Sequence, residues 1–450
     1  MKRTSNDLAS ESLWHLLIMY SVPAIIATAA ASTYNIIDRI FIGQGVGPLA
    51  ISGLALTFPL MNITAAFGAM VGVGSSSILS IRLGQHDRKG AIQILGNAVM
   101  LNIILGISVA LIIYIFLEPI LYAMGGSKET IPYAKEFMQV LLIGNVFTHL
   151  YHGLNNIIRA SGYPGKAMAI TILSVAVNLA LAPLFIFAFR WGIKGAALAT
   201  VIAQFTATGI AALHFMKSSS FVHFLPGYMK LKKHIIKDII SIGMSQFIML
   251  ICASIVVSIL NLGLRKHGGD FAIGAYGIIN SIMNLIAMVV LGLCQGMQPI
   301  AGYNFGAGQM KRVIKVFRLT IIAGTVVTCT GFLLVELFPH LISSAFTNDT
   351  HLIQLSATGL RICFAVFPIV GFQIVTSSFF QSIGKAKISI FLSLTRQVLF
   401  LIPLLFVLPF FWQLDGVWLA IPAADFTASL LTFIVMSQQL KKLKNITVGK

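Results

Sequence analysis

Hydrophobic residues recur along this chain in long uninterrupted runs, not in the alternating pattern of half-buried strands. Each run holds about 20 residues or more, enough for a helix to cross a hydrocarbon core of about 30 Å. Lipid offers no partners for backbone polar groups, so only helices and closed barrels span it, and non-alternating runs favour helices. We predict an all-α polytopic membrane protein with twelve transmembrane helices, at residues 13–42, 49–80, 91–117, 133–158, 166–189, 195–216, 236–264, 271–300, 313–337, 353–382, 386–411 and 416–438.

Composition supports this interpretation. Hydrophobic residues make up 57% of the 450 residues and charged residues 10%, whereas soluble domains average about 45–50% and about 25%. The first run contains Pro23 and Asp38 and is too long for the apolar part of a signal peptide, so we expect it to be a retained helix. No soluble domain is predicted.

The basic residues predict the orientation. Most of the 31 Lys and Arg residues lie near the two termini and in every second loop, around residues 82–89, 159–166, 217–237, 311–318 and 385–387. An even number of spans places both termini on that side, and the positive-inside rule makes it cytoplasmic. The net charge of +18 therefore reflects topology and contact with anionic lipid headgroups, and we do not expect nucleic acid binding.

The two halves of the chain resemble each other. A shift of 222 residues aligns ISGLALTFPLMNITA, from Ile51, with IGAYGIINSIMNLIA, from Ile273, and also RASG with QSIG. After a slip of one residue, ALATVIAQFTA aligns with WLAIPAADFTA. We predict two six-helix lobes, 1–216 and 238–450, joined by a cytoplasmic basic linker at 217–237. Because six is even, the two repeats are parallel.

Duplicated membrane domains are typical of secondary transporters, although duplication also produces channels and structural membrane proteins. The chain has no G-x-x-x-x-G-K-[ST] motif, so an ion gradient is a more fitting energy source than ATP. A membrane enzyme is the least favoured class, because no D-D-x-x-D, H-E-x-x-H or Ser/His/Asp cluster occurs. We expect no cofactor and no metal site: His149 and His152 form H-x-x-H without a nearby carboxylate or thiol, which favours polar or cleft-lining histidines.

Asp38 lies inside the first predicted span. A charge at the centre of a bilayer costs about 2.5–3.5 kcal/mol even on the permissive insertion scale, so such an acid points to an ion or substrate pathway. The repeat places Leu260 opposite it, so the helix packs without an acid in the other copy. Tyr34 and Asn35 share its helical face. The alternative is that Asp38 pairs with Arg39 at the outer headgroup boundary.

A second pair of charges lies in the other half. Arg396 falls near the middle of the eleventh span and Asp425 near the middle of the twelfth, and buried opposite charges usually pair. One interpretation is a structural ion pair within the C-terminal lobe. The other is that Asp425 contacts a cationic substrate or binds a second proton.

Several motifs together resemble the multidrug and toxic compound extrusion (MATE) transporters, and among them the proton-coupled DinF-like and MepA-like bacterial members. These motifs are the acid in the first helix, RASGYPGK after the fourth, GIKGAALATVIAQ at the sixth and QSIGKAK after the tenth. The resemblance implies a V-shaped pair of six-helix bundles whose central cleft opens alternately to either face. It further implies export of amphipathic, often cationic, drugs in exchange for H⁺ or Na⁺ across the bacterial cytoplasmic (inner) membrane.

The resemblance also implies roles for single residues. Asp38 matches the first-helix acid whose protonation is linked to substrate release, and Tyr34 precedes it by one turn. Further matches are the fifth-helix Asn178, the sixth-helix Thr200, and Asn155 or Asn156 late in the fourth helix. One position departs from the family pattern N-x-x-x-D, because Ala182 stands where the acid is usual.

The single acid favours a proton as the coupling ion. A proton needs one carboxylate, whereas Na⁺ needs several converging oxygens. A Na⁺ cage of Asp38, Asn35, Asn178 and Thr200 remains an alternative. A flippase for a lipid-linked precursor is the second functional reading; it predicts a basic cleft, which the scarcity of Lys and Arg inside the spans, Arg396 excepted, disfavours. We expect a monomer whose partners are drug-like small molecules, the coupling ion and lipids.

Overall fold

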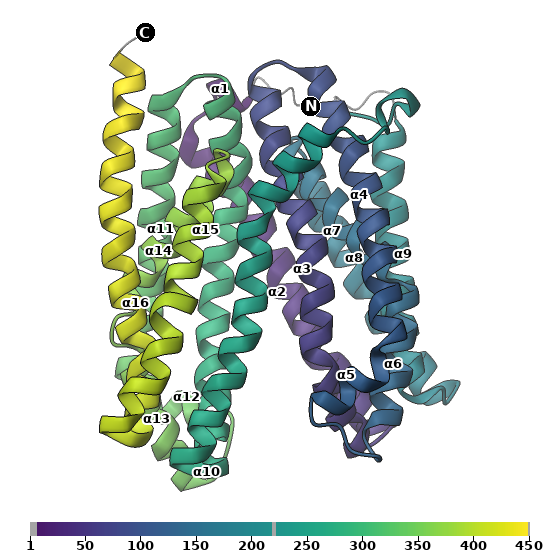
Figure 1. Ribbon diagram of the computed structural model, residues 1–450, viewed down its shortest axis with the longest axis vertical. Helices are drawn as coiled ribbons and strands as arrows, with labels where there is room; N and C mark the ends of the chain where they lie inside the picture. Colours follow the sequence, from purple (N-terminus) through teal and green to yellow (C-terminus); the bar gives the residue numbers. More distant parts are fainter. Residues whose placement is uncertain (1–6, 218–221, 449–450) are drawn as a thin grey trace. The chain divides into compact units, whose positions relative to one another are not determined.

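The computed structural model describes residues 7–217 and 222–448 (Figure 1). Every regular element within these ranges is a helix. The first half of the chain contains α1 (Asp7–Ser10), α2 (Leu13–Gly45), α3 (Pro48–Gly84), α4 (Arg88–Ile115), α5 (Leu117–Ala123), α6 (Ile131–Ile143), α7 (Asn145–Ala160), α8 (Pro164–Pro183), the π-helix η1 (Leu184–Ala188) and α9 (Gly192–Met216).

The second half repeats this order after the short 3₁₀ helix η2 (Pro226–Tyr228). It contains α10 (Lys233–Gly306), α11 (Met310–Leu337), α12 (Pro339–Ser344), α13 (Thr350–Phe364), α14 (Phe367–Ser382), α15 (Ala386–Leu394), the π-helix η3 (Thr395–Leu401) and α16 (Ile402–Val448). α10 is continuous except at Gly269, whose φ of 65° separates two helices of membrane-spanning length.

The predicted spans correspond to these helices. Across residues 7–217 and 222–448, nine helices are long and apolar enough to cross a membrane, and α13 with α14, bent by 54°, would make a tenth. The last two predicted spans lie in one of the nine, which breaks at Trp412 and Gln413. The predicted span 133–158 is formed by two shorter helices, α6 and α7, that meet at Gly144. The chain is thus a polytopic helical membrane protein.

The structure confirms the internal repeat. The helices α4 and α11 each have 28 residues and begin 222 residues apart, and α7 and α14, with 16 residues each, are related by the same shift. Left-handed backbone recurs at matching positions, with φ of 98° at Gly162 and 76° at Gly384. Both copies also carry a π-helix, η1 and η3, directly after the helix that follows these glycines. The two halves therefore fold by the same local rules.

The chain forms two compact units that are not continuous in sequence. The N-terminal unit consists of Met1–Ser10 with Ile26–Phe247, and the C-terminal unit of Glu11–Ile25 with Ile248–Lys450. This division differs from the continuous lobes expected at 1–216 and 238–450. The start of α2 packs within the C-terminal unit, and the start of α10 within the N-terminal unit.

Glycines permit this exchange because they let helices approach closely. A Cβ on Gly243 of α10 would collide with the carbonyl of Met70 on α3, within the N-terminal unit. A Cβ on Gly296 would collide with Ser21 of α2, within the C-terminal unit. Ser21 and Gly243 are themselves 222 residues apart, so the two exchanges obey the repeat.

The expected linker 217–237 is described except for residues 218–221, which lie outside the described ranges. Its later part is fixed to α4 of the N-terminal unit by Asn97, a fully buried residue. The Asn97 Nδ2 donates to the carbonyl of Lys230 at 3.3 Å, and the Lys232 N–H donates to Asn97 Oδ1 at 2.7 Å. The nitrogen and the oxygen of the Asn97 side-chain amide are thus both hydrogen-bonded to the backbone of the linker.

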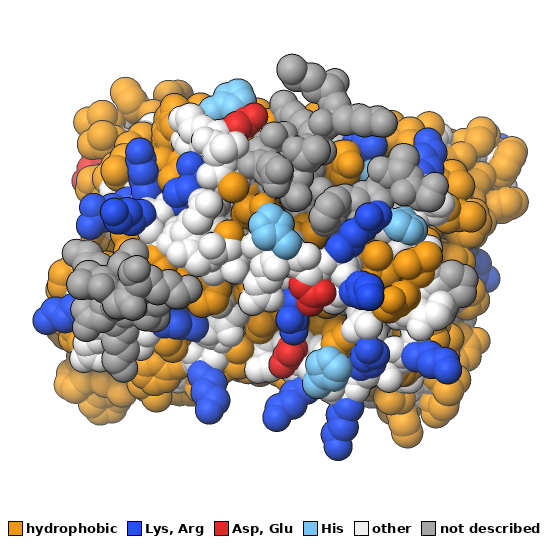
Figure 2. All heavy atoms as spheres, turned by 90° about the horizontal axis from the view of Figure 1, so that it is seen from above, with side chains coloured by type: hydrophobic (Ala, Val, Ile, Leu, Met, Phe, Trp, Pro, Cys, Tyr) orange, Lys and Arg blue, Asp and Glu red, His pale blue; other side chains and the backbone are white. Residues whose placement is uncertain are grey.

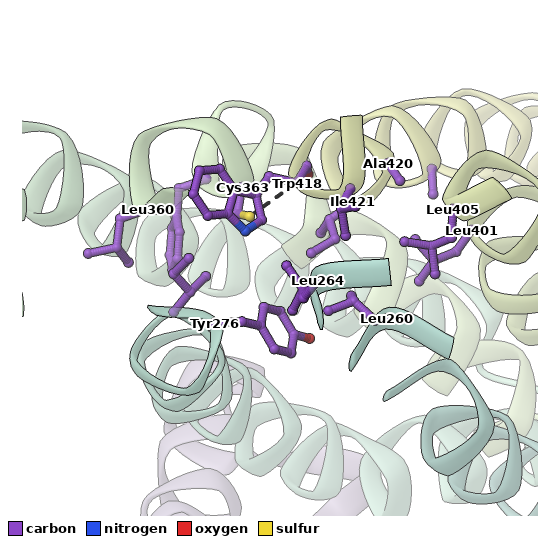
Figure 3. Packing of buried hydrophobic residues seen from close by; sticks show 14 of the residues in the cluster. Leu260, Leu264, Tyr276, Leu360, Cys363, Leu401, Leu405, Trp418, Ala420 and Ile421 are labelled. Atoms are coloured by element: carbon purple, nitrogen blue, oxygen red, sulfur yellow. Dashed lines mark hydrogen bonds between the residues drawn. The ribbon is translucent and has the colours of Figure 1, made fainter. Parts of the chain in front are cut away.

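A dense apolar cluster fills the C-terminal unit (Figure 3). Trp418 is 1% exposed, and its carbonyl accepts from the Cys363 thiol at 3.8 Å. Leu260, which the repeat places opposite Asp38, is also 1% exposed within this cluster. Between membrane helices, such close packing supplies the stabilisation that expulsion of water supplies in soluble proteins.

Candidate functional site

Two adjoining cavities lie within the N-terminal unit. The larger has a volume of about 310 Å³ and is lined from α2, α3, α6, α7 and α9. The smaller has about 210 Å³ and is lined from α2, α7, α8 and α9. The two cavities share the side chains of Tyr34, His152, Thr200 and Gln204. The two cavities therefore adjoin at these four side chains.

Asp38 lines the larger cavity from α2. Its side chain is largely buried, with 9% exposed, and no donor within the described residues reaches its Oδ1. The neighbouring Arg39 lies 5.7 Å from the centroid of the Phe58 ring, and the ion pairs found among the described residues do not join it to Asp38. This arrangement disfavours the headgroup ion pair and leaves a carboxylate oxygen open to a ligand.

Tyr34 stands one turn before Asp38 and lines both cavities. The spacing of four residues places both side chains on one face of α2. Asn35 also lies in α2, but its side chain falls outside the described part of the structure. The expected contribution of Asn35 therefore stays a prediction.

Asn178 and Thr200 meet across α8 and α9. The Asn178 Nδ2 donates to Thr200 Oγ1 at 3.0 Å, and that hydroxyl donates to the carbonyl of Ala196 at 3.2 Å. Asn178 is 2% exposed, and its Oδ1 has no donor among the described residues. Because the amide nitrogen is fixed, the acceptor oxygen is the group left for an ion or a water at the smaller cavity, which Asn178 lines.

Asn155 repeats this arrangement on α7. Its Nδ2 donates to Thr171 Oγ1 at 2.8 Å, and the Tyr151 hydroxyl donates to the same oxygen at 2.9 Å. Thr171 lines the smaller cavity. No described donor reaches Asn155 Oδ1. Asn156, the alternative at this position, instead donates to the His152 carbonyl of its own helix at 2.9 Å.

Ala182 is fully buried in an apolar cluster with Ile42, Phe185 and Ile193. The position at which the family pattern N-x-x-x-D has an acid is thus occupied by close-packed hydrocarbon. Nothing at this position substitutes for the missing carboxylate.

The structure adds residues that the sequence did not single out as site residues. Thr148 on α7 donates to Gln204 on α9, and both line the larger cavity. His152 was expected only as a cleft-lining histidine and indeed lines both cavities. The alignment of AAD with IAQ pairs Gln204 with Asp425, so Gln204 could have been found as the polar counterpart of a residue already selected.

Arg396 and Asp425 meet within the C-terminal unit. The Arg396 Nε donates to Asp425 Oδ1 at 2.6 Å, and the Asp425 side chain is 2% exposed. The contact joins the π-helix η3 to α16. This geometry favours the structural ion pair over a substrate contact, because the carboxylate is enclosed by protein and already neutralised.

The chain can now be compared with known proteins. The MatE family model matches residues 23–184 and 242–407, one segment in each half. The chain is 28% identical over 422 residues to multidrug export protein MepA of Staphylococcus aureus strain N315, covering 93% of this chain and 92% of the relative. It is 26% identical over 427 residues to MepA of Staphylococcus saprophyticus, covering 94% of each chain.

Solved structures show the same fold. A structure described as the outward-facing conformation of a multidrug resistance MATE family transporter of the MOP superfamily superimposes with a TM-score of 0.93, at 23% identity, over 99% of each chain. A MOP superfamily transporter from Pyrococcus furiosus, described as having a binding pocket of reverse polarity, gives a TM-score of 0.91 over 99% of each chain. With both matched segments, the full-length relatives and this fold, the chain belongs to the MatE family of transporters, in its MepA-like group.

Proposed function

We propose that the protein exports amphipathic cationic compounds in exchange for protons, by alternating access, across the bacterial cytoplasmic membrane. The observation that supports this most directly is Asp38, a buried carboxylate with an unpartnered oxygen on the wall of the larger cavity. An intramembrane acid of this kind is a functional group by default, since packing alone gives no reason to retain it. Its counterpart Leu260 shows that packing does not require it.

The larger cavity suits a flat apolar cation. Its walls include Phe58, Met61, Phe137 and Met138, with Asp38 as the anionic group. Aromatic and methionine side chains adapt to ligands of different shape, which is a property of promiscuous binding surfaces. The volume of about 310 Å³ lies at the lower end of the range for drug-sized sites, about 300–1,000 Å³. The curated relatives named multidrug export protein support this assignment.

The cationic compound and the proton are exchanged because they compete for one carboxylate, that of Asp38. Ionised Asp38 attracts a cationic compound from the cytoplasmic side, because an unscreened opposite charge in a low-dielectric site binds strongly. A proton arriving from the outer side neutralises the carboxylate and removes that attraction, so the compound leaves outward. Loss of the proton to the cytoplasm restores the binding state. A ligand that binds one protonation state better than the other shifts the conformational equilibrium accordingly.

Sodium is the second candidate for the coupling ion. The unpartnered oxygens of Asn155 and Asn178 are ligands that Na⁺ would accept. We favour the proton because Ala182 supplies no second carboxylate and the nearest oxygens are neutral.

A flippase for a lipid-linked precursor is supported less well by the cavities. A pyrophosphate or phosphate headgroup needs several converging basic side chains, and Arg39 is the one Lys or Arg residue on the walls of the two described cavities.

We also propose that both termini are cytoplasmic. Lys and Arg side chains are frequent and acidic ones sparse on the end face drawn in Figure 2, as the positive-inside rule expects of a cytoplasmic face.

Reconstitution in liposomes tests this proposal. We expect an imposed pH gradient to drive ethidium transport in the wild type, and an imposed Na⁺ gradient to drive none. Asp38→Asn should abolish the pH-driven transport, because the amide neither ionises nor carries a proton. Asp87→Asn is the matched control: Asp87 lies outside the cavities and caps α4 by accepting from the Gly90 N–H at 2.8 Å, a bond that asparagine retains.

The other possible results of this experiment would each change the proposal in a different way. Transport driven by Na⁺ alone would replace the proton by sodium in the scheme. Unaltered pH-driven transport in Asp38→Asn would exclude Asp38 as the proton carrier. Absence of transport under either gradient would favour the flippase.

A further inference from the structure

We propose that His152 is a second proton-binding group of the same site, so that each cycle imports two protons for one exported cation. This inference rests on the proposed function and extends it to the stoichiometry. It concerns the wall between the two cavities, where His152 is the one imidazole that reaches both among the described residues.

The environment of His152 leaves its ring free to exchange a proton. Its contacts are a ring contact with Tyr151, with centroids 5.1 Å apart, and a hydrogen bond from Asn156 to its backbone carbonyl. Neither occupies a ring nitrogen, and over residues 7–217 and 222–448 no hydrogen bond to the imidazole is found. An imidazole on a cavity wall with both nitrogens open can accept a proton without first breaking an internal bond.

His149 shows the contrast one turn earlier on the same helix. Its Nε2 lies 2.9 Å from the carbonyl of Thr64, and the side chain is fully buried behind the cavity walls. Such a contact fixes the tautomer and orientation of the ring. His149 therefore serves the packing of α7 on α3, while His152 faces the cavities.

No other group near the cavities is suited to a second proton. The charged or titratable side chains around them are Tyr34, Asp38 and Arg39 from α2, and His149, Tyr151 and His152 from α7. The described lining residues from α3, α6, α8 and α9 are uncharged. Tyrosine and arginine ordinarily titrate at about 10 and above 12. Since the His149 ring is held by Thr64, Asp38 and His152 are the remaining groups of the two residue types whose ordinary pKa values lie closest to neutral.

Two such groups change what the site does to a cation. With Asp38 ionised and His152 neutral, these two side chains together carry one negative charge and attract the compound. With both protonated, they carry one positive charge and repel it, while the charge of Arg39 on the same wall stays constant. Release is then driven by repulsion as well as by lost attraction. The exchange of two protons for a monovalent cation moves one net positive charge inward per cycle, so transport becomes sensitive to the membrane potential.

The test compares the dependence on membrane potential in proteoliposomes, with potassium and valinomycin setting the potential and no pH gradient imposed. In the wild type, the steady-state ethidium gradient should change about tenfold for roughly 60 mV, since one net charge moves per cycle. In His152→Asn, one proton exchanges for one cation, so the potential should have no effect while a pH gradient still drives transport. His86→Asn is the matched control: His86 lies in the loop before α4, where φ is 59°, a conformation asparagine tolerates.

A second measurement does not depend on transport, so it can be used if the His152→Asn variant transports too slowly to be followed. Protons released on ethidium binding to detergent-solubilised protein are counted in weak buffer across pH 5 to 8. We expect both Asp38→Asn and His152→Asn to release fewer protons than the wild type, each over its own pH range. A potential response or proton release in His152→Asn equal to that of the wild type overturns the inference and leaves the antiporter intact. Failure of the wild type to move ethidium under any gradient overturns both.

Discussion

At the scale of the residue, the site is defined by which oxygens lack partners. Asp38, Asn155 and Asn178 each keep an acceptor without a described donor, although the amide nitrogens of the two asparagines donate to threonine hydroxyls. Unpaired buried polar atoms cost free energy, which favours a ligand or a water that supplies the missing contact at these three oxygens. In the proposed function, that ligand is a proton, a cation or a bridging water.

Sequence reasoning found Asp38, Tyr34, Asn178 and Thr200, which the structure brings to the cavity walls. It could do so because an acid in an apolar run is conspicuous and helical spacing fixes a face. It did not select Gln204, Thr148 or His152 as site residues, since neutral polar residues occur throughout such helices. Which of them face a cavity depends on helix packing that spacing along one helix does not determine.

The first prediction at this scale concerns Ala182. Ala182→Asp introduces the acid of the family pattern N-x-x-x-D, but it buries a carboxylate in the apolar cluster around Phe185. We expect a loss of stability of about 2.5–3.5 kcal/mol, seen as a lower thermal unfolding midpoint in detergent. Ala182→Ser, of nearly the same size, should unfold close to the wild type. An unchanged midpoint for Ala182→Asp would mean that the position has a polar partner after all.

At the scale of the element, the repeat explains where helices break. α6 and α7 meet at Gly144, and α13 and α14 meet near Ala365 at the matching place in the other copy. The sequence predicted one span at each place, because hydropathy measures the length of an apolar run and does not report a bend within it. The π-helices η1 and η3 were likewise not predicted, since the extra residue in a π turn leaves no clear mark in an apolar sequence.

The ion pair between η3 and α16 leads to the prediction at this scale. Arg396→Gln leaves the Asp425 carboxylate buried without its partner, which typically costs about 3–5 kcal/mol. We expect the unfolding midpoint to fall sharply, and the combined exchange Arg396→Asp with Asp425→Arg to recover part of the loss. Because the pair is structural, transport by the exchanged protein should remain coupled to protons.

The exposed pair of Lys135 and Glu118 provides the control. Its N–O distance is also 2.6 Å, but both side chains are more than a third exposed. Lys135→Gln should leave the midpoint unchanged, because solvent screens exposed ion pairs. Equal effects of Arg396→Gln and Lys135→Gln would contradict a structural role for the buried pair.

At the scale of the whole molecule, one ancestral unit has taken two forms. The halves share helix lengths, breaks and left-handed turns, so the repeat and the helix order were predictable from the sequence. The exchange of helix starts between the two units was not, because it rests on close contacts at Gly243 and Gly296 that no sequence pattern reveals. The N-terminal copy places Asp38 and Gln204 on a cavity wall, whereas the repeat places Leu260 and the ion-paired Asp425 at the corresponding positions of the C-terminal copy.

The most direct test of the account measures protons moved by a drug gradient. Liposomes holding the protein and a trapped pH indicator receive an ethidium gradient, with no pH gradient or Na⁺ present. We predict that ethidium movement in the wild type drives protons the opposite way and changes the internal pH, and that Asp38→Asn produces no change. Ethidium movement without any change of internal pH would contradict the account, because transport would then proceed without its coupling proton.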